Sequence, residues 1–194
     1  REASVDIDAI ADNVRHFRRL TGVQVIAVVK ANAYGHGAAA AAVAALAGGA
    51  TRLGVAEIPE AIDLRRQGIT APILAWLHAP GERFVQAAEH DIEVGILSFD
   101  QLEAAGAAAA VDRPVGVHLK FETGLSRNGI APADWRRVLA EAARLERIGR
   151  LRIIGLFSHL SNTSLQDDRE ALAKFEEGVA LAASFGIPPE IRHI

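Results

Sequence analysis

Short apolar runs alternate with longer amphipathic segments along the whole chain, and this alternation restricts the possible folds more than any other feature. The runs are rich in β-branched residues, as in 24–29, which predicts strands that are covered on both faces. The segments between them carry apolar residues at helical spacing, as in 8–20, where Asp6 or Asp8 is placed to cap the helix. Strands that alternate with helices at so short a repeat predict parallel βα units.

Seven such units fit into the 194 residues. We expect strands at 24–29, 52–56, 72–77, 92–97, 115–121, 151–157 and 191–194, and helices at 8–20, 38–47, 59–67, 81–89, 98–110, 132–146 and 168–185. Two closures are open to these units, a doubly wound open sheet or a (β/α)8 barrel. A barrel of about 250 residues needs one more unit. The sequence therefore predicts an α/β fold, a (β/α)8 TIM-type barrel that is incomplete at its C-terminal end, with residues 1–194 as one domain.

Charge and cysteine content exclude several functions. The net charge of −3 leaves no basic surface for nucleic acid or for an anionic membrane. No cysteine is present, so disulfides and thiol nucleophiles are excluded. The N-terminus shows no signal peptide, and the alanine-rich run 38–47 is too short to cross a bilayer. These features fit a cytoplasmic protein.

Polar residues gather where the predicted strands end, which is where α/β proteins place their sites. The chain has only three lysines against eighteen arginines, yet Lys30 and Lys120 both end apolar strands. A lysine amine can lose its proton when it is desolvated and can form a Schiff base, and arginine can do neither. Two simpler interpretations stay open: Lys30 could reach out to solvent, and Lys120 could pair with Glu122 or Glu57.

No standard nucleotide or metal motif is present. The run Gly35-His36-Gly37 precedes a predicted helix and could hold a phosphate at the helix N-terminus. It has neither the Walker A spacing nor the dinucleotide fingerprint. The chain also lacks an HExxH zinc pair and a GxSxG elbow, so we expect no metal site.

Three segments resemble the alanine racemase family. They are AVVKANAYGHG at 27–37, VHLKFETGLSRNG at 117–129 and GLFSHL at 155–160. The first resembles the family's pyridoxal-phosphate attachment segment, with a nearly complete match over its eleven residues. Order and spacing agree along essentially the whole chain, so the resemblance implies a pyridoxal 5'-phosphate enzyme that interconverts L-alanine and D-alanine for peptidoglycan.

The resemblance also implies roles for individual residues. Lys30 would bind the cofactor as a Schiff base and act as the base on one face of the substrate Cα, and Tyr34 would bond the cofactor phosphate. Trp76 would lie near the pyridine ring. Lys120 corresponds to a lysine that is often carbamylated and then orients Arg127, which would reach the cofactor and the substrate carboxylate. The family places His159 against the ring, and His193 at the head of its HxANSA segment.

The chain departs from the family in three respects. Glu122 stands where the family usually has Asp, and SNTS at 161–164 replaces a run like ATAD, with no catalytic role assigned to either. The family's phosphate-binding Asn-Ser pair, the arginine that faces the pyridine nitrogen, the C-terminal β-domain and a tyrosine base from the partner subunit of a homodimer would all follow Ile194. We therefore expect this stretch alone to be inactive.

Three alternatives stay open beside that interpretation. The first is another pyridoxal-phosphate barrel enzyme, such as a broad-specificity racemase, a D-amino-acid aldolase or dehydratase, or a basic-amino-acid decarboxylase. The second is a non-catalytic barrel that carries the cofactor. The third is a purely structural or interaction domain. The run 31–37 argues against the first two, and no feature beyond the truncation supports the third.

Overall fold

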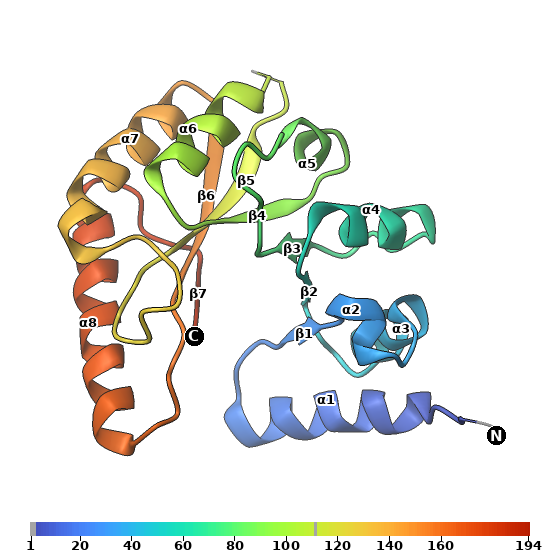
Figure 1. The fold of residues 1–194 in the computed structure, drawn as a ribbon. Coiled ribbons are helices and arrows are strands. Elements are labelled where there is room, and N and C mark those ends of the chain that lie inside the picture. The colour runs from blue at the N-terminus through green and yellow to red at the C-terminus, as the bar shows by residue number, and fades with distance from the viewer. Residues whose placement is uncertain (1–2, 111) are drawn as a thin grey trace. The chain divides into compact units, whose positions relative to one another are not determined.

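The computed structural model describes residues 3–110 and 112–194, which fall into two compact units. The first unit comprises Arg1–His78 and His90–Ile92, and the second comprises Ala79–Glu89 and Glu93–Ile194. No helix in the described ranges is long and apolar enough to span a bilayer. Each unit is built from the same repeating element, a parallel strand followed by a helix (Figure 1).

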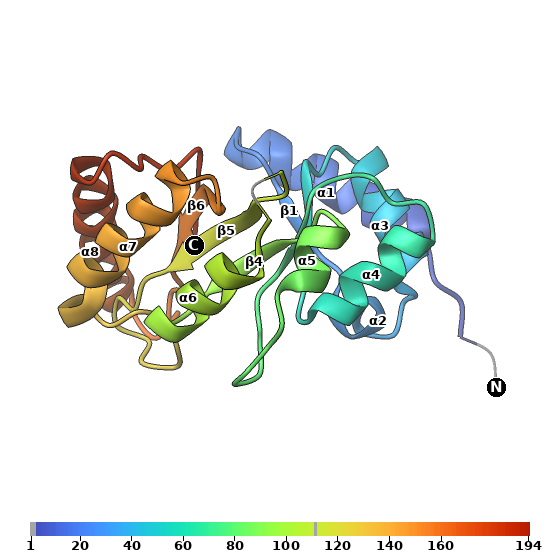
Figure 2. The same ribbon diagram turned by 90° about the horizontal axis from the view of Figure 1, so that it is seen from above.

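The first unit has a short parallel sheet in which β2 lies between β1 and β3. Helices α1 and α3 pack against each other and lie side by side in Figure 2. The elements are α1 (Ile7–Thr21), β1 (Ile26–Val28), α2 (Lys30–Tyr34), α3 (Ala38–Ala47), β2 (Arg52–Val55), α4 (Ile58–Arg66) and β3 (Ile73–Ala75).

The second unit has four parallel strands that neighbour one another in chain order, β4 to β7. Both views show α6, α7 and α8 on the same side of these strands. The elements are α5 (Val85–Glu89), β4 (Glu93–Ile96), α6 (Phe99–Ala108), β5 (Val115–Lys120), η1 (Pro132–Asp134), α7 (Trp135–Arg147), β6 (Leu151–Phe157), α8 (Leu165–Ser184) and β7 (Ile191–His193).

Side-chain caps fix where the long helices begin. Asp6 accepts a hydrogen bond from the backbone N–H of Ala9 and starts α1, as one of the two predicted caps. Ser98 caps α6 in the same way. Ser164 caps α8, so that helix begins at Leu165, three residues before the predicted start. The earlier start follows because the serine hydroxyl satisfies an N–H group that water would otherwise have to bond.

The predicted core is confirmed where the periodicity is strongest. The apolar residues at helical spacing in the helix predicted at 132–146 are buried in α7: Trp135, Val138, Leu139, Ala142 and Leu145. The β2, β3 and β4 strands are buried at every position, as expected for strands with both faces covered. Most of the predicted strands are shorter than expected, as are the helices predicted at 81–89 and 98–110. The strand at 24–29 is regular only over Ile26–Val28, and α5 begins at Val85 because Gly81 takes a left-handed conformation.

Candidate functional site

Lys30 follows β1 directly and opens an unusual turn. Four consecutive residues after it, Ala31 to Tyr34, have φ between 51° and 54°, and Gly35 continues the turn at φ 91°. Such a left-handed turn is costly for alanine, at roughly 1–2 kcal/mol per residue, and persists only where its surroundings hold it. Sequence reasoning missed it, because only Asn32 and Gly35 tolerate this conformation and alanine signals the opposite hand.

Two side chains hold the turn in place. Glu60, near the start of α4, accepts hydrogen bonds from the backbone N–H of Ala31 at 2.6 Å and of Ala56 at 2.7 Å. Asn32 accepts a bond from the N–H of Ala38 at 2.8 Å. That bond occupies one of the free N–H groups at the start of α3, which sequence reasoning considered for a phosphate. Glu60 therefore ties the residue after Lys30 to the residue after β2.

The other predicted residues of the first unit lie at the same edge. Tyr34 ends the turn and is 63% exposed, so its hydroxyl is open to a ligand. Trp76 follows β3 and lies across Gly54 of β2, since a β-carbon built on Gly54 would be 2.0 Å from the indole. The first unit thus brings an amine, a hydroxyl and an aromatic face to the carboxyl ends of three neighbouring strands.

In the second unit Lys120 ends β5 and is almost fully buried. Its Nζ donates to Oδ1 of Asn128 and lies 5.8 Å from the centre of the Phe157 ring. Burial lowers the pKa of this amine below its usual value, and the charge of Arg127 lowers it further against the opposing effect of Glu122. The hydrogen-bond partner of Lys120 is Asn128 and not Glu122. Glu122 instead accepts hydrogen bonds from the backbone N–H groups of Gly124 and Ser126.

Arg127 and His159 are both exposed, in the loops that follow β5 and β6. Arg127 acts on Lys120 through its positive charge, which contributes to the lowered pKa of that amine. The two loops are joined below them, because Ser158 donates to the carbonyl of Phe121 at 2.9 Å and its hydroxyl lies 2.6 Å from that of Thr123. A hollow of about 550 Å³ lies at this edge, lined in part by Thr123, Ser161, Thr163 and Lys174.

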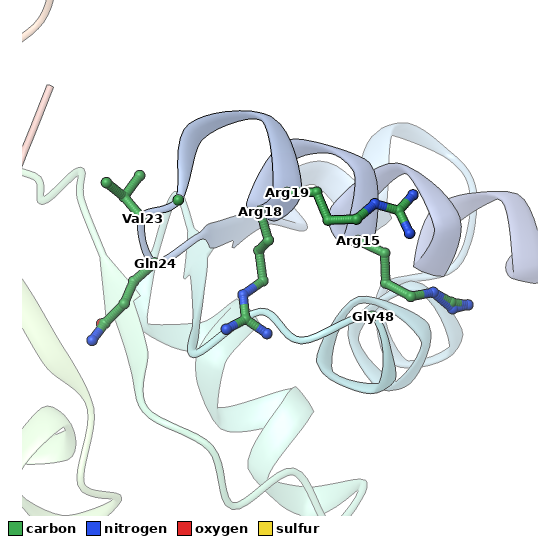
Figure 3. Close-up of a pocket in the computed structure, with 7 residues that line it drawn as sticks. Arg15, Arg18, Arg19, Val23, Gln24 and Gly48 are labelled. Carbon is green, nitrogen blue, oxygen red and sulfur yellow. The ribbon is translucent and has the colours of Figure 1, made fainter.

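A second hollow lies at the amino end of β1 (Figure 3). Its volume is about 420 Å³, and it is lined by Arg15, Arg18, Arg19, Val23, Gln24 and Gly48. Arg18 and Arg19 lie in the last turn of α1, where positive charge offsets the partial negative charge of the helix end. Arg15 pairs with Asp12 at 3.1 Å. The hollow belongs to the opposite end of β1 from Lys30 and supplies nothing to the candidate site.

Parallel βα units with polar side chains where the strands end are typical of one class of proteins. They are the α/β barrel proteins that carry their site at the carboxyl ends of the strands. Within that class the sequence places the chain further. It belongs to the alanine racemase N-terminal domain family, because the family described as "Alanine racemase, N-terminal domain" matches residues 5–194.

Individual relatives agree with this family. The chain is 46% identical to an alanine racemase of Thermobifida fusca, covering 100% of this chain and 53% of that protein. It is 48% identical to one of Mycolicibacterium smegmatis, covering 98% and 50%. The chain therefore spans about half the length of the curated relatives it matches.

Solved structures show the same fold. The crystal structure of alanine racemase from D-cycloserine-producing Streptomyces lavendulae superposes with a TM-score of 0.93 at 39% identity, covering 98% of this chain and 51% of that chain. The alanine racemase of Streptomyces coelicolor gives a TM-score of 0.93 at 40% identity, covering 98% and 52%. The predicted fold class, an incomplete (β/α) barrel, is confirmed.

Proposed function

We propose that the chain is the pyridoxal-phosphate-binding barrel domain, residues 1–194, of an alanine racemase, a cytoplasmic enzyme that interconverts L-alanine and D-alanine for peptidoglycan. The observation that carries this proposal is the position of Lys30, held after β1 by a left-handed turn that Glu60 and Asn32 stabilise. A strained turn kept in place by specific bonds is typical of a site where one side chain must be oriented.

The side chains of the first unit fit the cofactor. Lys30 offers a primary amine to bind an aldehyde carbon, Tyr34 an exposed hydroxyl for the phosphate, and Trp76 an aromatic ring for the pyridine. Gly54 is required beside Trp76, because any β-carbon there would occupy the space of the indole. When bound, pyridoxal phosphate supplies an electron sink that stabilises negative charge at Cα.

Racemisation removes the proton from one face of Cα and returns one to the other face. We assign removal of the proton from one face to the amine of Lys30. We assign the proton transfer on the other face to a group outside residues 1–194, a tyrosine of the partner subunit in a homodimer. Arg127 is assigned to the substrate carboxylate, because an exposed guanidinium binds carboxylates through two parallel hydrogen bonds. His159 is assigned to the cofactor ring.

Lys120 is assigned to the orientation of Arg127. Its lowered pKa favours the neutral amine, which is the form that adds carbon dioxide to give a carbamate and release a proton. A carbamate would place negative charge beside Arg127 and would accept hydrogen bonds from its guanidinium. The amine itself, in contrast, repels Arg127 whenever it is protonated.

Reductive trapping tests the proposal. The full-length protein is mixed with pyridoxal phosphate, reduced with borohydride and mapped by peptide mass spectrometry. We expect the label on Lys30, its loss in Lys30→Arg, and its retention in Lys174→Arg, which removes the lysine of α8. Racemisation should fall by on the order of 10²- to 10⁴-fold in Lys30→Arg. Label on another residue in the wild type would overturn the assignment, and label on Lys30 without racemisation would favour a cofactor carrier.

A further inference from the structure

Three polar side chains form a continuous line inside the second unit. Glu93 at the start of β4 lies 3.0 Å from Nε2 of His118 in β5. Nδ1 of His118 lies 3.1 Å from Nε2 of His193 in β7. His118 is 0% exposed and Glu93 is 5% exposed, so both groups are removed from water. Sequence reasoning assigned no role to His118 or to Glu93.

The surrounding backbone leaves room for this line. A β-carbon on Gly155 of β6 would lie 2.3 Å from Nδ1 of His118, so only a glycine leaves space for the ring there. The pairing of β5 with β6 also shifts register between Val117 and His118. Such an irregularity re-aims a side chain. Gly155 and the shifted register together place the His118 ring between Glu93 and His193.

The far end of the line reaches the candidate site. The His193 ring stacks on the Phe157 ring, with centroids 4.7 Å apart and planes 5° from parallel. Phe157 in turn lies under the amine of Lys120. The orientation of His193 is therefore set on one side by His118 and on another by a ring that also contacts the site.

We propose that Glu93 is a positioning residue that acts through His118 to fix the His193 ring with its proton on Nε2. This inference rests on the proposed function, since His193 stacks on the ring that lies beside Lys120. A carboxylate only accepts hydrogen bonds, so Nε2 of His118 carries the proton between them. In the neutral ring Nδ1 then accepts, and Nε2 of His193 must donate to it.

The direction of these two hydrogen bonds determines which groups His193 can bind. When both rings are neutral, Nδ1 of His193 carries no proton, so any group that meets Nδ1 must donate a hydrogen bond. A guanidinium, an ammonium or a protonated ring nitrogen meets this condition, and a fully ionised phosphate does not. The line therefore assigns His193 to a cationic or N–H partner of the site and excludes it from holding the phosphate of a cofactor.

Nitrogen NMR on the full-length protein tests the line without cofactor or alanine. The protein is labelled with [15N]histidine, and the ring signals of His118 and His193 are assigned from His118→Gln and His193→Gln. At neutral pH we expect both rings to show a protonated Nε2 and a bare Nδ1. In Glu93→Gln the side-chain amide can donate as well as accept, so both ring signals should shift toward a mixture of tautomers.

A matched control separates this effect from a general loss of charge. Glu176 of α8 pairs with Arg192 of β7 at 3.1 Å, next to His193 but outside the line. Glu176→Gln should leave both ring signals in place. A protonated Nδ1 on His193 in the wild type, or unchanged signals in Glu93→Gln, would overturn the inference. Because reductive trapping at Lys30 is a separate measurement, failure of the proposed function can be told apart from failure of this line.

Discussion

Trp76 occupies the space that a side chain on Gly54 would need. A β-carbon at position 54 would lie 2.0 Å from Cη2 of the indole, closer than any real contact. Gly54 lies in β2, where it pairs with Leu74 of β3, and Trp76 directly follows β3. The ring of Trp76 is therefore set by a glycine on the next strand, at the edge where Lys30 lies.

Gly54→Ala should displace the Trp76 ring. Overpacking of this kind costs roughly 1–3 kcal/mol of unfolding free energy, measured by urea denaturation. Trp76→Ala removes the indole and leaves that space empty. In this background Gly54→Ala should therefore lower the unfolding free energy clearly less than it does in the wild type. Equal costs in the two backgrounds would show that the indole is not what excludes a side chain from position 54.

Asn32 should be replaceable by glycine more easily than by alanine. Asn32→Ala loses the hydrogen bond to the N–H of Ala38 and places a third alanine in the left-handed turn, for a cost of about 1–2 kcal/mol. Asn32→Gly loses only the bond, because glycine adopts a positive φ freely. Thermal unfolding of the two variants gives the order, and a more stable alanine variant would contradict the left-handed conformation.

Glu60→Gln should loosen the turn after Lys30. The carboxylate accepts bonds from the N–H groups of Ala31, Ala56 and Glu57, and an amide can place only one oxygen among them. We expect a loss of about 1–3 kcal/mol and faster hydrogen exchange at Ala31 and Ala56. Asp63→Asn is the matched control on α4, because Asp63 pairs with the exposed Arg66. Unchanged hydrogen exchange at Ala31 in Glu60→Gln would contradict the hydrogen bond from the Ala31 N–H to the Glu60 carboxylate.

Lys120 should titrate below an ordinary lysine. The chain contains three lysines, so labelling with [13Cε]lysine gives three signals, and Lys120→Arg identifies the one from β5. Burial, reinforced by Arg127, lowers the pKa of this amine, so its signal should shift at a pH below the usual value of 10.5. A signal from Lys120 that titrates at or above 10.5 would contradict the buried position.

The same shift has a consequence for stability. Between the lowered pKa of the folded state and 10.5 the unfolded chain binds more protons at this position than the folded one. The penalty for burying the ammonium is therefore fully present below that window and is relieved as the pH rises through it. Relative to Lys120→Met, the wild type should gain stability with rising pH in this range, as measured by urea unfolding at several pH values.

The sequence by itself determined the order of the elements and the edge where the site lies. Periodicity and capping are local properties, so the cap at Asp6, the apolar face of α7 and the strand-end positions of Lys30 and Lys120 could be read from neighbouring residues. The family resemblance then supplied roles for those positions, which no periodicity contains.

Only the tertiary structure decided which side chains meet. The left-handed turn at 31–34 depends on Glu60, which is 29 residues from Ala31, and alanine propensity alone points to the opposite hand. The line from Glu93 to His193 depends on a register shift in β5 and on Gly155 in the neighbouring strand. Contacts of this kind are set by the pairing of distant strands, and neither the pattern of any one segment nor its composition encodes that pairing.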